Sequence, residues 1–176
     1  MSSGLFLLIY VTLQRLVELV IARRNTRALL ARGAYEAGAA HYPAMVALHA
    51  TWLVTLWIFG WSRTLVPGYF ALVVVLQVGR FWVLRTLGAR WTTRIIITPW
   101  AQPVTSGPFR FVRHPNYLIV AFELPAISLA LGLLWHALVF GALNLVMIAW
   151  RIRSENAAFA IPTSVWEHRS VDIGKQ

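Results

Sequence analysis

Residues 117–150 read YLIVAFELPAISLALGLLWHALVFGALNLVMIAW, an apolar run with a single carboxylate. A helix needs roughly 20 apolar residues to cross the hydrocarbon core of a bilayer. The run is too long for one ordinary span, so we expect a tight helical hairpin with spans at 117–134 and 136–150. Trp135 and His136 are the expected hinge between the two spans.

The composition of the whole chain supports an integral membrane protein. Of its 176 residues, 59% are hydrophobic and only 12% are charged, which lies outside the range of ordinary soluble domains. Further apolar stretches at 4–22, 43–61 and 67–84 bring the expected number of spans to about five. The chain has no cysteine, which excludes a disulfide framework and a thiolate metal site. We expect one all-α membrane domain over residues 1–176.

The basic residues predict how this domain is oriented. The net charge is +10, but the arginines stand in blocks between apolar runs, which favours membrane topology over a nucleic-acid partner. Cytoplasmic flanks of membrane proteins are enriched in Lys and Arg. Nearly all basic flanks lie in 23–42, 85–116 and 151–176, whereas Arg63 alone lies in the opposite loops. We therefore expect the N-terminus outside and the C-terminus in the cytosol.

A polar, turn-rich segment, GPFRFVRHPNYL at 107–118, directly precedes the apolar run. Its prolines and glycine exclude a regular helix over most of its length, and Pro115 suits the first position of the next helix. Backbone N–H groups at a helix start attract anions. Arg113 adds positive charge, His114 an imidazole and Tyr117 a hydroxyl. Composition leaves two interpretations open, a ligand-binding turn or an interfacial loop with snorkelling arginines.

Arg151 and Glu155 follow the last span in the segment WRIRSENAAF. They are four residues apart, so on a helix they share one face. A solvated surface pair with little energetic value is the simple interpretation. Their position on the same side of the membrane as the 107–118 turn favours a role in binding, in which the arginine holds an anion.

Ionisable residues inside apolar spans are costly and often functional. Glu123 lies two turns into the fourth span, just before Pro125, and we expect it to have a functional or network role. Arg80 lies near the inner end of the third span. Arg15 and Glu18 are three residues apart in the first span, and we expect a local ion pair there.

The histidines near the second span are simpler. We expect His49 to be a packing residue, and His41 and Tyr42 are placed to line an entrance. No His, Asp or Glu cluster has the spacing of a metal site, and the chain has no glycine-rich nucleotide fingerprint.

The turn GPFRFVRHPNYL and the later RIRSEN together resemble the isoprenylcysteine carboxyl methyltransferase (ICMT) family. The pattern of that family is a Gly-Pro-aromatic turn ending in Arg-His-Pro-x-Tyr, followed by a helix end Arg-Ile-x-x-Glu-Glu. The resemblance covers about residues 85–160. Two upstream segments, RNTRALLARGAYEAGAAHYPAMVALHATWL and LGARWTTRIIITP, are similar to a bacterial branch that methylates hydroxyls of alkylpyrones and alkylresorcinols.

The resemblance implies an integral-membrane enzyme that uses S-adenosyl-L-methionine. The cofactor would bind in a cytosolic pocket formed by the loop before span 4 and by the C-terminal helix. The implied cofactor-binding residues are Gly107, Pro108, Phe109, Arg113, His114, Pro115, Tyr117 and Glu155. The expected catalytic residues are Arg151 and Glu155, with His114 and Glu123 as the available bases. One departure is Asn156, which stands where the family has its second glutamate.

The resemblance therefore predicts O-methylation of a lipophilic acceptor, either an isoprenylcysteine-type carboxyl group or an alkylpyrone or alkylresorcinol hydroxyl. The alternatives are a phospholipid N-methyltransferase and a sterol-reductase-like enzyme that uses NADPH. Amine methylation calls for a carboxylate-lined pocket, so Asn156 disfavours the first alternative. The expected partners are the lipophilic substrate and membrane lipids, without nucleic acid.

Overall fold

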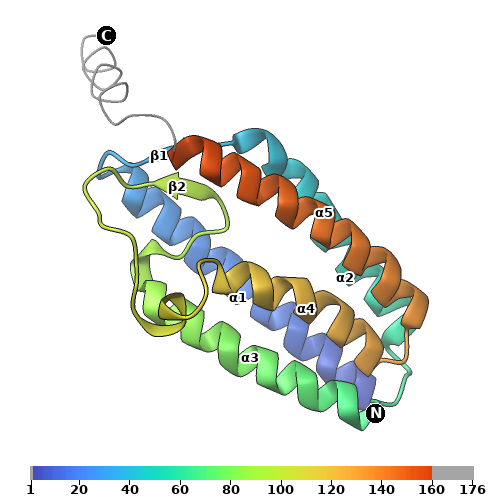
Figure 1. The fold of residues 1–176 in the computed structure, drawn as a ribbon. Helices are drawn as coiled ribbons and strands as arrows, with labels where there is room; N and C mark the ends of the chain where they lie inside the picture. Colours follow the sequence, from blue (N-terminus) through green and yellow to red (C-terminus); the bar gives the residue numbers. More distant parts are fainter. Residues whose placement is uncertain (1, 160–176) are drawn as a thin grey trace.

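The computed structural model describes residues 2–159, which form a bundle of helices capped at one end by irregular segments (Figure 1). The helices are α1 (Ser3–Leu30), α2 (Tyr42–Gly60), α3 (Pro67–Leu87), α4 (Pro115–Ala130) and α5 (Leu134–Phe159). Short 3-10 turns lie at Ala39–His41, Gly88–Arg90 and Gly107–Arg110. The chain begins at one end of the bundle, and the 31–41 and 88–114 loops lie at the other end (Figure 1).

The prediction of an all-α membrane protein is confirmed. In the described residues, α1, α3, α5 and the Ala39–Gly60 segment are long and apolar enough to cross a membrane. With 16 residues, α4 is shorter, about 24 Å at 1.5 Å per residue, against a hydrocarbon core of about 30 Å. Large apolar side chains such as Val20 (68% exposed) and Val78 (67%) point away from the bundle. Lipid tails would cover this surface, which is larger than a soluble monomer exposes.

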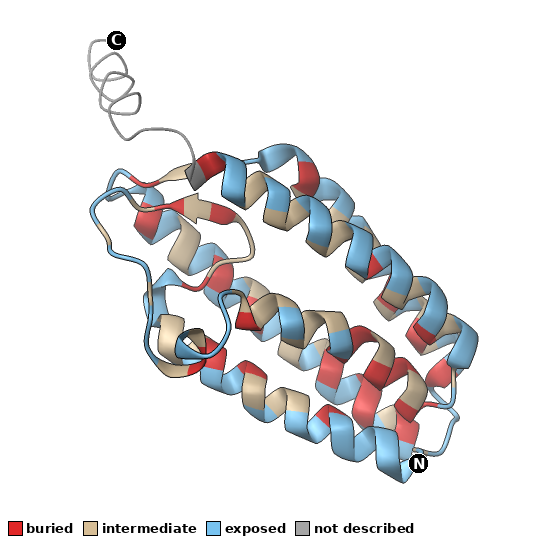
Figure 2. Cartoon of the chain, viewed as in Figure 1, coloured by how far each residue is buried: buried red, intermediate tan, exposed pale blue. Residues whose placement is uncertain are grey.

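The main core lies in the half of the bundle near the N-terminus, where buried residues of several helices meet (Figure 2). Leu8 of α1, Trp52 of α2 and Ile127 of α4 are almost fully buried in it. α1 and α2 approach closely here, because a Cβ added to Gly4 would lie 2.7 Å from the carbonyl oxygen of Gly60. Glycine is therefore required at this crossing, and the packing leaves the opposite half of the bundle for cavities.

The helical hairpin expected in 117–150 is present, but its break is not at Trp135 and His136. The chain reverses at 131–133, where Gly132 has a φ of +69°. The N–H of Gly132 bonds to the Leu129 carbonyl (2.9 Å), and that of Leu133 bonds to the Ser128 carbonyl (2.9 Å). This is the usual glycine-terminated helix end.

The expected hinge residue His136 instead lies inside α5. Its ring nitrogens lie 2.9 Å from Ser128 Oγ and 2.8 Å from Thr55 Oγ1, so it ties the start of α5 to α4 and α2. α5 then continues to Phe159, well beyond the expected end at 150. This extension carries Arg151 and Glu155 on regular helix.

Two short strands were not expected. β1 (Tyr35–Ala37) and β2 (Ile95–Ile97) pair antiparallel, with Glu36 opposite Ile96. Arg94 Nη1 lies 2.7 Å from the Glu36 carboxylate, which raises the pKa of that guanidinium. β2 also packs against Ala158 of α5. The loop after α3 is thereby fastened to both the α1–α2 loop and α5, over the end of the bundle that holds the cavities.

Candidate functional site

The 107–118 turn is built against the end of α3. Gly107 has a φ of +59°, and a Cβ there would lie 2.5 Å from Thr86 Oγ1. Pro108 is buried in the following 3-10 turn. Pro115 is the first residue of α4, as the sequence predicts, and His114 caps it. The turn therefore sets where the first residues of α4 point.

Tyr117, Arg151 and Glu155 are brought together where α4 meets α5. The Tyr117 hydroxyl donates a hydrogen bond to the Glu155 carboxylate. Arg151 Nε donates to the same hydroxyl oxygen at 3.0 Å. The side chains of Tyr117 on α4 and of Arg151 and Glu155 on α5 thus form one connected hydrogen-bonded group.

Arg151 also ties this group to two other elements. Its Nη1 donates to the Thr93 carbonyl (2.6 Å) in the loop after α3 and to Met45 Sδ (3.1 Å) of α2. Its Nη2 makes no hydrogen bond to any described residue. His114 stacks on the Tyr117 ring, with centroids 5.3 Å apart. The Arg151 side chain is thus fixed in position and keeps one nitrogen available for a ligand.

Two cavities border this group. The first, of about 190 Å³, which we name the polar cavity, lies between the 88–114 loop, the start of α4 and the end of α5. Its lining includes six of the residues predicted from the sequence: Phe109, His114, Pro115, Tyr117, Arg151 and Glu155. Arg90 and Arg94 also line it.

The second cavity, of about 290 Å³, lies deeper in the bundle, and we name it the apolar cavity. Its lining comes from α1 (Thr12, Arg15, Leu16, Glu18 and Leu19), α2 (Tyr42, Met45, Val46, His49, Ala50 and Leu53), α4 (Asn116, Tyr117 and Val120), α5 (Asn144, Met147, Ile148 and Arg151), Arg80 and Trp91–Thr93. Tyr42 is there, as expected for an entrance, whereas His41 is buried beside Trp150 and lines neither cavity.

Five residues line both cavities: Trp91, Thr92, Asn116, Tyr117 and Arg151. Trp91 is 4% exposed, and its indole N–H has no hydrogen-bond partner among residues 2–159. The Oδ1 atom of Asn116 is likewise buried and unpaired within that range. Buried polar groups are normally satisfied, so a donor and an acceptor left free at this boundary indicate a ligand site.

Four of the predicted site residues lie outside both cavities, three of them in the turn. Gly107 and Pro108 shape the turn from behind, and Arg113 is exposed at its surface. Asn156, the position that departs from the ICMT pattern, is exposed and does not line either cavity. The side-chain amide of Asn156 therefore contributes nothing to the surface of either cavity.

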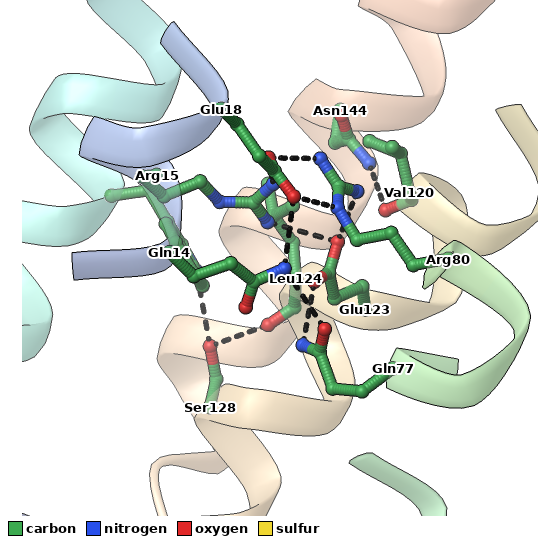
Figure 3. Close-up of polar contacts among 11 residues, drawn as sticks. Gln14, Arg15, Glu18, Gln77, Arg80, Val120, Glu123, Leu124, Ser128 and Asn144 are labelled. Carbon is green, nitrogen blue, oxygen red and sulfur yellow. Dashed lines mark hydrogen bonds and ion pairs between the residues drawn. The ribbon is translucent and has the colours of Figure 1, made fainter. Parts of the chain in front are cut away.

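Glu123 lies elsewhere, in a network of charged and amide side chains inside the bundle (Figure 3). Its carboxylate accepts hydrogen bonds from Arg15 (2.9 Å), Arg80 (2.8 Å) and Gln77 (2.9 Å). It is fully buried and lines neither cavity. The structure therefore does not bring it together with Tyr117, and a carboxylate that accepts three hydrogen bonds is a weak base.

Glu18 completes this network. It accepts two hydrogen bonds of 2.5 Å from Arg80 and one of 3.0 Å from Gln14. The Arg15–Glu18 pair expected from the sequence is present at 3.3 Å, but it belongs to a larger cluster that joins α1, α3 and α4. Two arginines and two glutamates give no net charge, which is the condition under which buried ions are tolerated.

Several cavity residues were missed by the sequence reasoning. Trp91 and Thr92 stand in the quoted segment LGARWTTRIIITP, and Asn116 stands in the quoted turn, but none has a titratable group that draws attention. Asn144 is a polar residue in the middle of an apolar span, and that anomaly was a usable signal.

The chain is similar to known proteins in sequence. The sequence profile of the isoprenylcysteine carboxyl methyltransferase (ICMT) family matches residues 69–161, which include nearly all of α3, the turn, α4 and α5. An uncharacterized protein of Bacillus subtilis, YpbQ, is 32% identical over 150 residues, which cover 82% of this chain and 89% of that protein. An uncharacterized protein of Haemophilus influenzae is 29% identical over 153 residues, with 83% and 88% coverage. No solved structure matches the chain significantly.

Proposed function

The chain belongs to the isoprenylcysteine carboxyl methyltransferase (ICMT) family, and we propose that it transfers a methyl group from S-adenosyl-L-methionine to an oxygen atom of a lipophilic acceptor. The observation that carries this proposal is the boundary between the two cavities. A water-soluble methyl donor would occupy the polar cavity, and a lipid would occupy the apolar one. The two ligands would meet at Tyr117 and Arg151, which line both.

The residues of the polar cavity fit the chemistry of this cofactor, which supplies a methyl group on a positively charged sulfonium. Phe109 and Trp91 offer aromatic faces for an adenine ring. The Glu155 carboxylate can accept hydrogen bonds from ribose hydroxyls or lie beside the sulfonium charge. Arg90 suits the carboxylate of the methionine moiety. The unpaired Trp91 N–H and Asn116 Oδ1 provide two further contacts.

Arg151 would orient the acceptor oxygen. Its Nε and Nη1 are already engaged, which leaves Nη2 to donate to an anionic oxygen at the boundary. Methyl transfer forms a bond from that oxygen to carbon and breaks the carbon–sulfur bond, whose electron pair stays on sulfur. The reaction depends on alignment, and positioning of this kind is worth about 7–11 kcal/mol.

The groups around Arg151 bear on the state of the acceptor. Glu123 lies outside both cavities, so it cannot reach the acceptor to remove a proton, and we assign Glu155 of the polar cavity to the cofactor. A carboxylate or an acidic enol arrives without that proton and needs no base. A phenol would require His114, the remaining candidate. We therefore favour an acidic acceptor.

We further propose that the polar cavity faces the cytosol. The end of the bundle with the cavities carries the exposed arginines 23, 24, 27, 32, 85, 90, 110, 113 and 153, and the opposite end carries Arg63. Positive flanks are typical of the cytoplasmic side. The N-terminus, at the end opposite the cavities, would then lie outside (Figure 1).

Calorimetric titration of the purified protein in detergent tests the cofactor assignment. S-adenosylhomocysteine should bind, and Glu155→Gln should weaken its binding about tenfold through loss of one charged hydrogen bond. Arg113→Gln is the matched control, because this exposed residue of the same turn lines neither cavity, and its affinity should equal that of the wild type. Binding of NADPH in place of S-adenosylhomocysteine would favour a reductase and overturn the proposal.

A further inference from the structure

The inner part of the apolar cavity has polar atoms that a hydrocarbon chain would leave unpaired. Asn144 of α5 lines this cavity and is 1% exposed. Its Nδ2 donates to the Val120 carbonyl at 3.0 Å (Figure 3). Its Oδ1 is buried without a partner among the described residues. Asn144 therefore presents a hydrogen-bond acceptor with nothing to satisfy it.

A second acceptor comes from His49 on α2, which lines the same cavity. Its Nδ1 lies 2.9 Å from the Met45 carbonyl oxygen. A carbonyl oxygen can only accept, so Nδ1 must carry the proton, and in the neutral ring Nε2 is then an acceptor. No described residue donates to that Nε2. His49 was expected to be a packing residue, and the structure gives it a free ring nitrogen instead.

Helix geometry places both acceptors at a similar depth below Thr93, the loop residue that contacts both Arg151 and Tyr42. Asn144 precedes Arg151 by seven residues on α5, and His49 follows Tyr42 by seven residues on α2. Seven residues are nearly two turns, so each pair shares a helix face with a separation of about 10 Å along the axis. The Asn144–Arg151 pair on α5 and the Tyr42–His49 pair on α2 therefore have the same separation along their helices, although α2 and α5 run in opposite directions.

On α2 and α5, the lining between these two depths is apolar. On α2 it consists of Met45 and Val46, and on α5 of Met147 and Ile148, whereas Glu18 of α1 and Arg80 of α3 line another part of the cavity and are paired with each other. Along α2 and α5 the cavity therefore has a polar group near the boundary, an apolar section of about 10 Å, and a second polar group within the bundle. This arrangement differs from that of a cavity for a plain hydrocarbon chain, which needs no inner polar group.

Arg15 of α1 adds a donor near the inner end. It lines the cavity, its side chain is 16% exposed, and its Nε is buried without a partner in the described chain. Its other two nitrogens are held by Glu18 and Glu123. These ion pairs already balance the charge of Arg15, so the inner end does not call for an anion.

We propose that His49, Asn144 and Arg15 form a subsite for a neutral hydroxyl group of the acceptor lipid, about 10 Å from the oxygen that receives the methyl group. A hydroxyl both donates and accepts, so it can bond to one of the two free acceptors and accept from Arg15. A carboxylate has no proton to donate to them, and an alkyl chain satisfies none of the three. This inference rests on the proposed function, in which the apolar cavity holds the acceptor.

The test compares two lipids that differ only at this group. The probes are stearate and a stearate that carries one hydroxyl about 10 Å along the chain from its carboxylate. Their affinities are measured by calorimetry on the purified full-length protein with S-adenosylhomocysteine present. The variant carries both His49→Leu and Asn144→Leu. Met147→Leu, in the apolar section of the same cavity, is the control.

The wild type and Met147→Leu should bind the hydroxylated lipid about tenfold more tightly than stearate, as expected for one buried hydrogen bond. A hydroxyl donates to only one of the two acceptors, so the variant that carries both His49→Leu and Asn144→Leu should lose most of this preference. It should keep wild-type affinity for S-adenosylhomocysteine, which also shows that it is folded. Equal affinity of the wild type for the two lipids, failure to bind either, or a preference that survives both substitutions would overturn the subsite. If S-adenosylhomocysteine itself does not bind, the proposed function fails, whereas a lost preference alone rejects only the subsite.

Discussion

Substitution of Glu123 by Gln would separate a structural role for this carboxylate from the catalytic role that the sequence suggested. The side chain is fully buried and accepts hydrogen bonds from Arg15, Arg80 and Gln77. Glutamine has the same size but removes one of the two negative charges. Glu18 would then be the only carboxylate for two buried guanidinium groups, with one positive charge left uncompensated.

Loss of one partner from a buried ion pair typically costs about 3–5 kcal/mol. We expect Glu123→Gln to lower the free energy of unfolding by about that amount, measured by reversible unfolding in mixed micelles of detergent and SDS. Gln77→Leu is the control, because it removes a single neutral donor and should cost about 1 kcal/mol. The double variant Arg15→Gln with Glu123→Gln restores neutrality and should be more stable than the sum of its parts predicts.

The same variants test function. Since Glu123 lines neither cavity, Glu123→Gln should bind S-adenosylhomocysteine with wild-type affinity at temperatures where it is folded. A change in stability smaller than about 1 kcal/mol, the size of one ordinary hydrogen bond, would refute the assigned network. A large loss of methyl transfer with stability unchanged would return Glu123 to a catalytic role.

Three further predictions concern the boundary, the turn and the topology. Arg151→Ala should lower the rate of methyl transfer at least a hundredfold in a labelled-methyl assay, because the group that orients the acceptor is lost. Tyr117→Phe should chiefly weaken the binding of S-adenosylhomocysteine. A near-normal rate in the first variant and a near-normal affinity in the second would remove these residues from the site. Gly107→Ala forces a side chain into a left-handed conformation and a 2.5 Å contact, so thermal unfolding should begin at a lower temperature, and an unchanged transition would contradict the turn geometry. Cysteines introduced at Ser62 and Ser106 should react with impermeant reagents from opposite sides of the membrane, and labelling from one side would reject the proposed orientation.

Features that depend on length and local composition could be predicted from the sequence. The apolar run at 117–150 required two helices, and Pro115 marked the start of α4, as the structure confirms. The break between the helices was misplaced because it was expected at the polar pair Trp135-His136, and the conformational freedom of Gly132 was overlooked. Only glycine readily adopts the positive φ that ends α4 there, so the local conformational argument was the stronger one.

Features that depend on pairing between distant segments could not be predicted in the same way. β1 and β2 have three residues each and lie about 60 residues apart, so neither forms a recognisable strand pattern alone. The ion pair between Arg80 and Glu18 joins two helices that no local spacing connects. For the same reason, the sequence suggested a local Arg15–Glu18 pair and a functional or network role for Glu123, but not that these residues and Arg80 pair with one another.

The residues of the candidate site also differ in how far they could be predicted from the sequence. The residues of the 107–118 turn and of the α5 end were found through a contiguous pattern, and the structure brings Tyr117, Arg151 and Glu155 into contact. Trp91 was not found, because it is a neutral residue whose unpaired N–H becomes evident only once its neighbours are known. Asn144 was overlooked, although a polar residue inside an apolar span was a usable signal.

The central claim is that a methyl donor in the polar cavity meets a lipid in the apolar cavity. The most direct measurement is to incubate membranes containing the protein with methyl-labelled S-adenosylmethionine and to identify the labelled lipids by mass spectrometry. The account predicts that the label is attached to oxygen in a lipophilic acid or enol and that labelling is lost in the Arg151→Ala variant. Absence of labelled lipid, or label on the amine of a phospholipid, would contradict it.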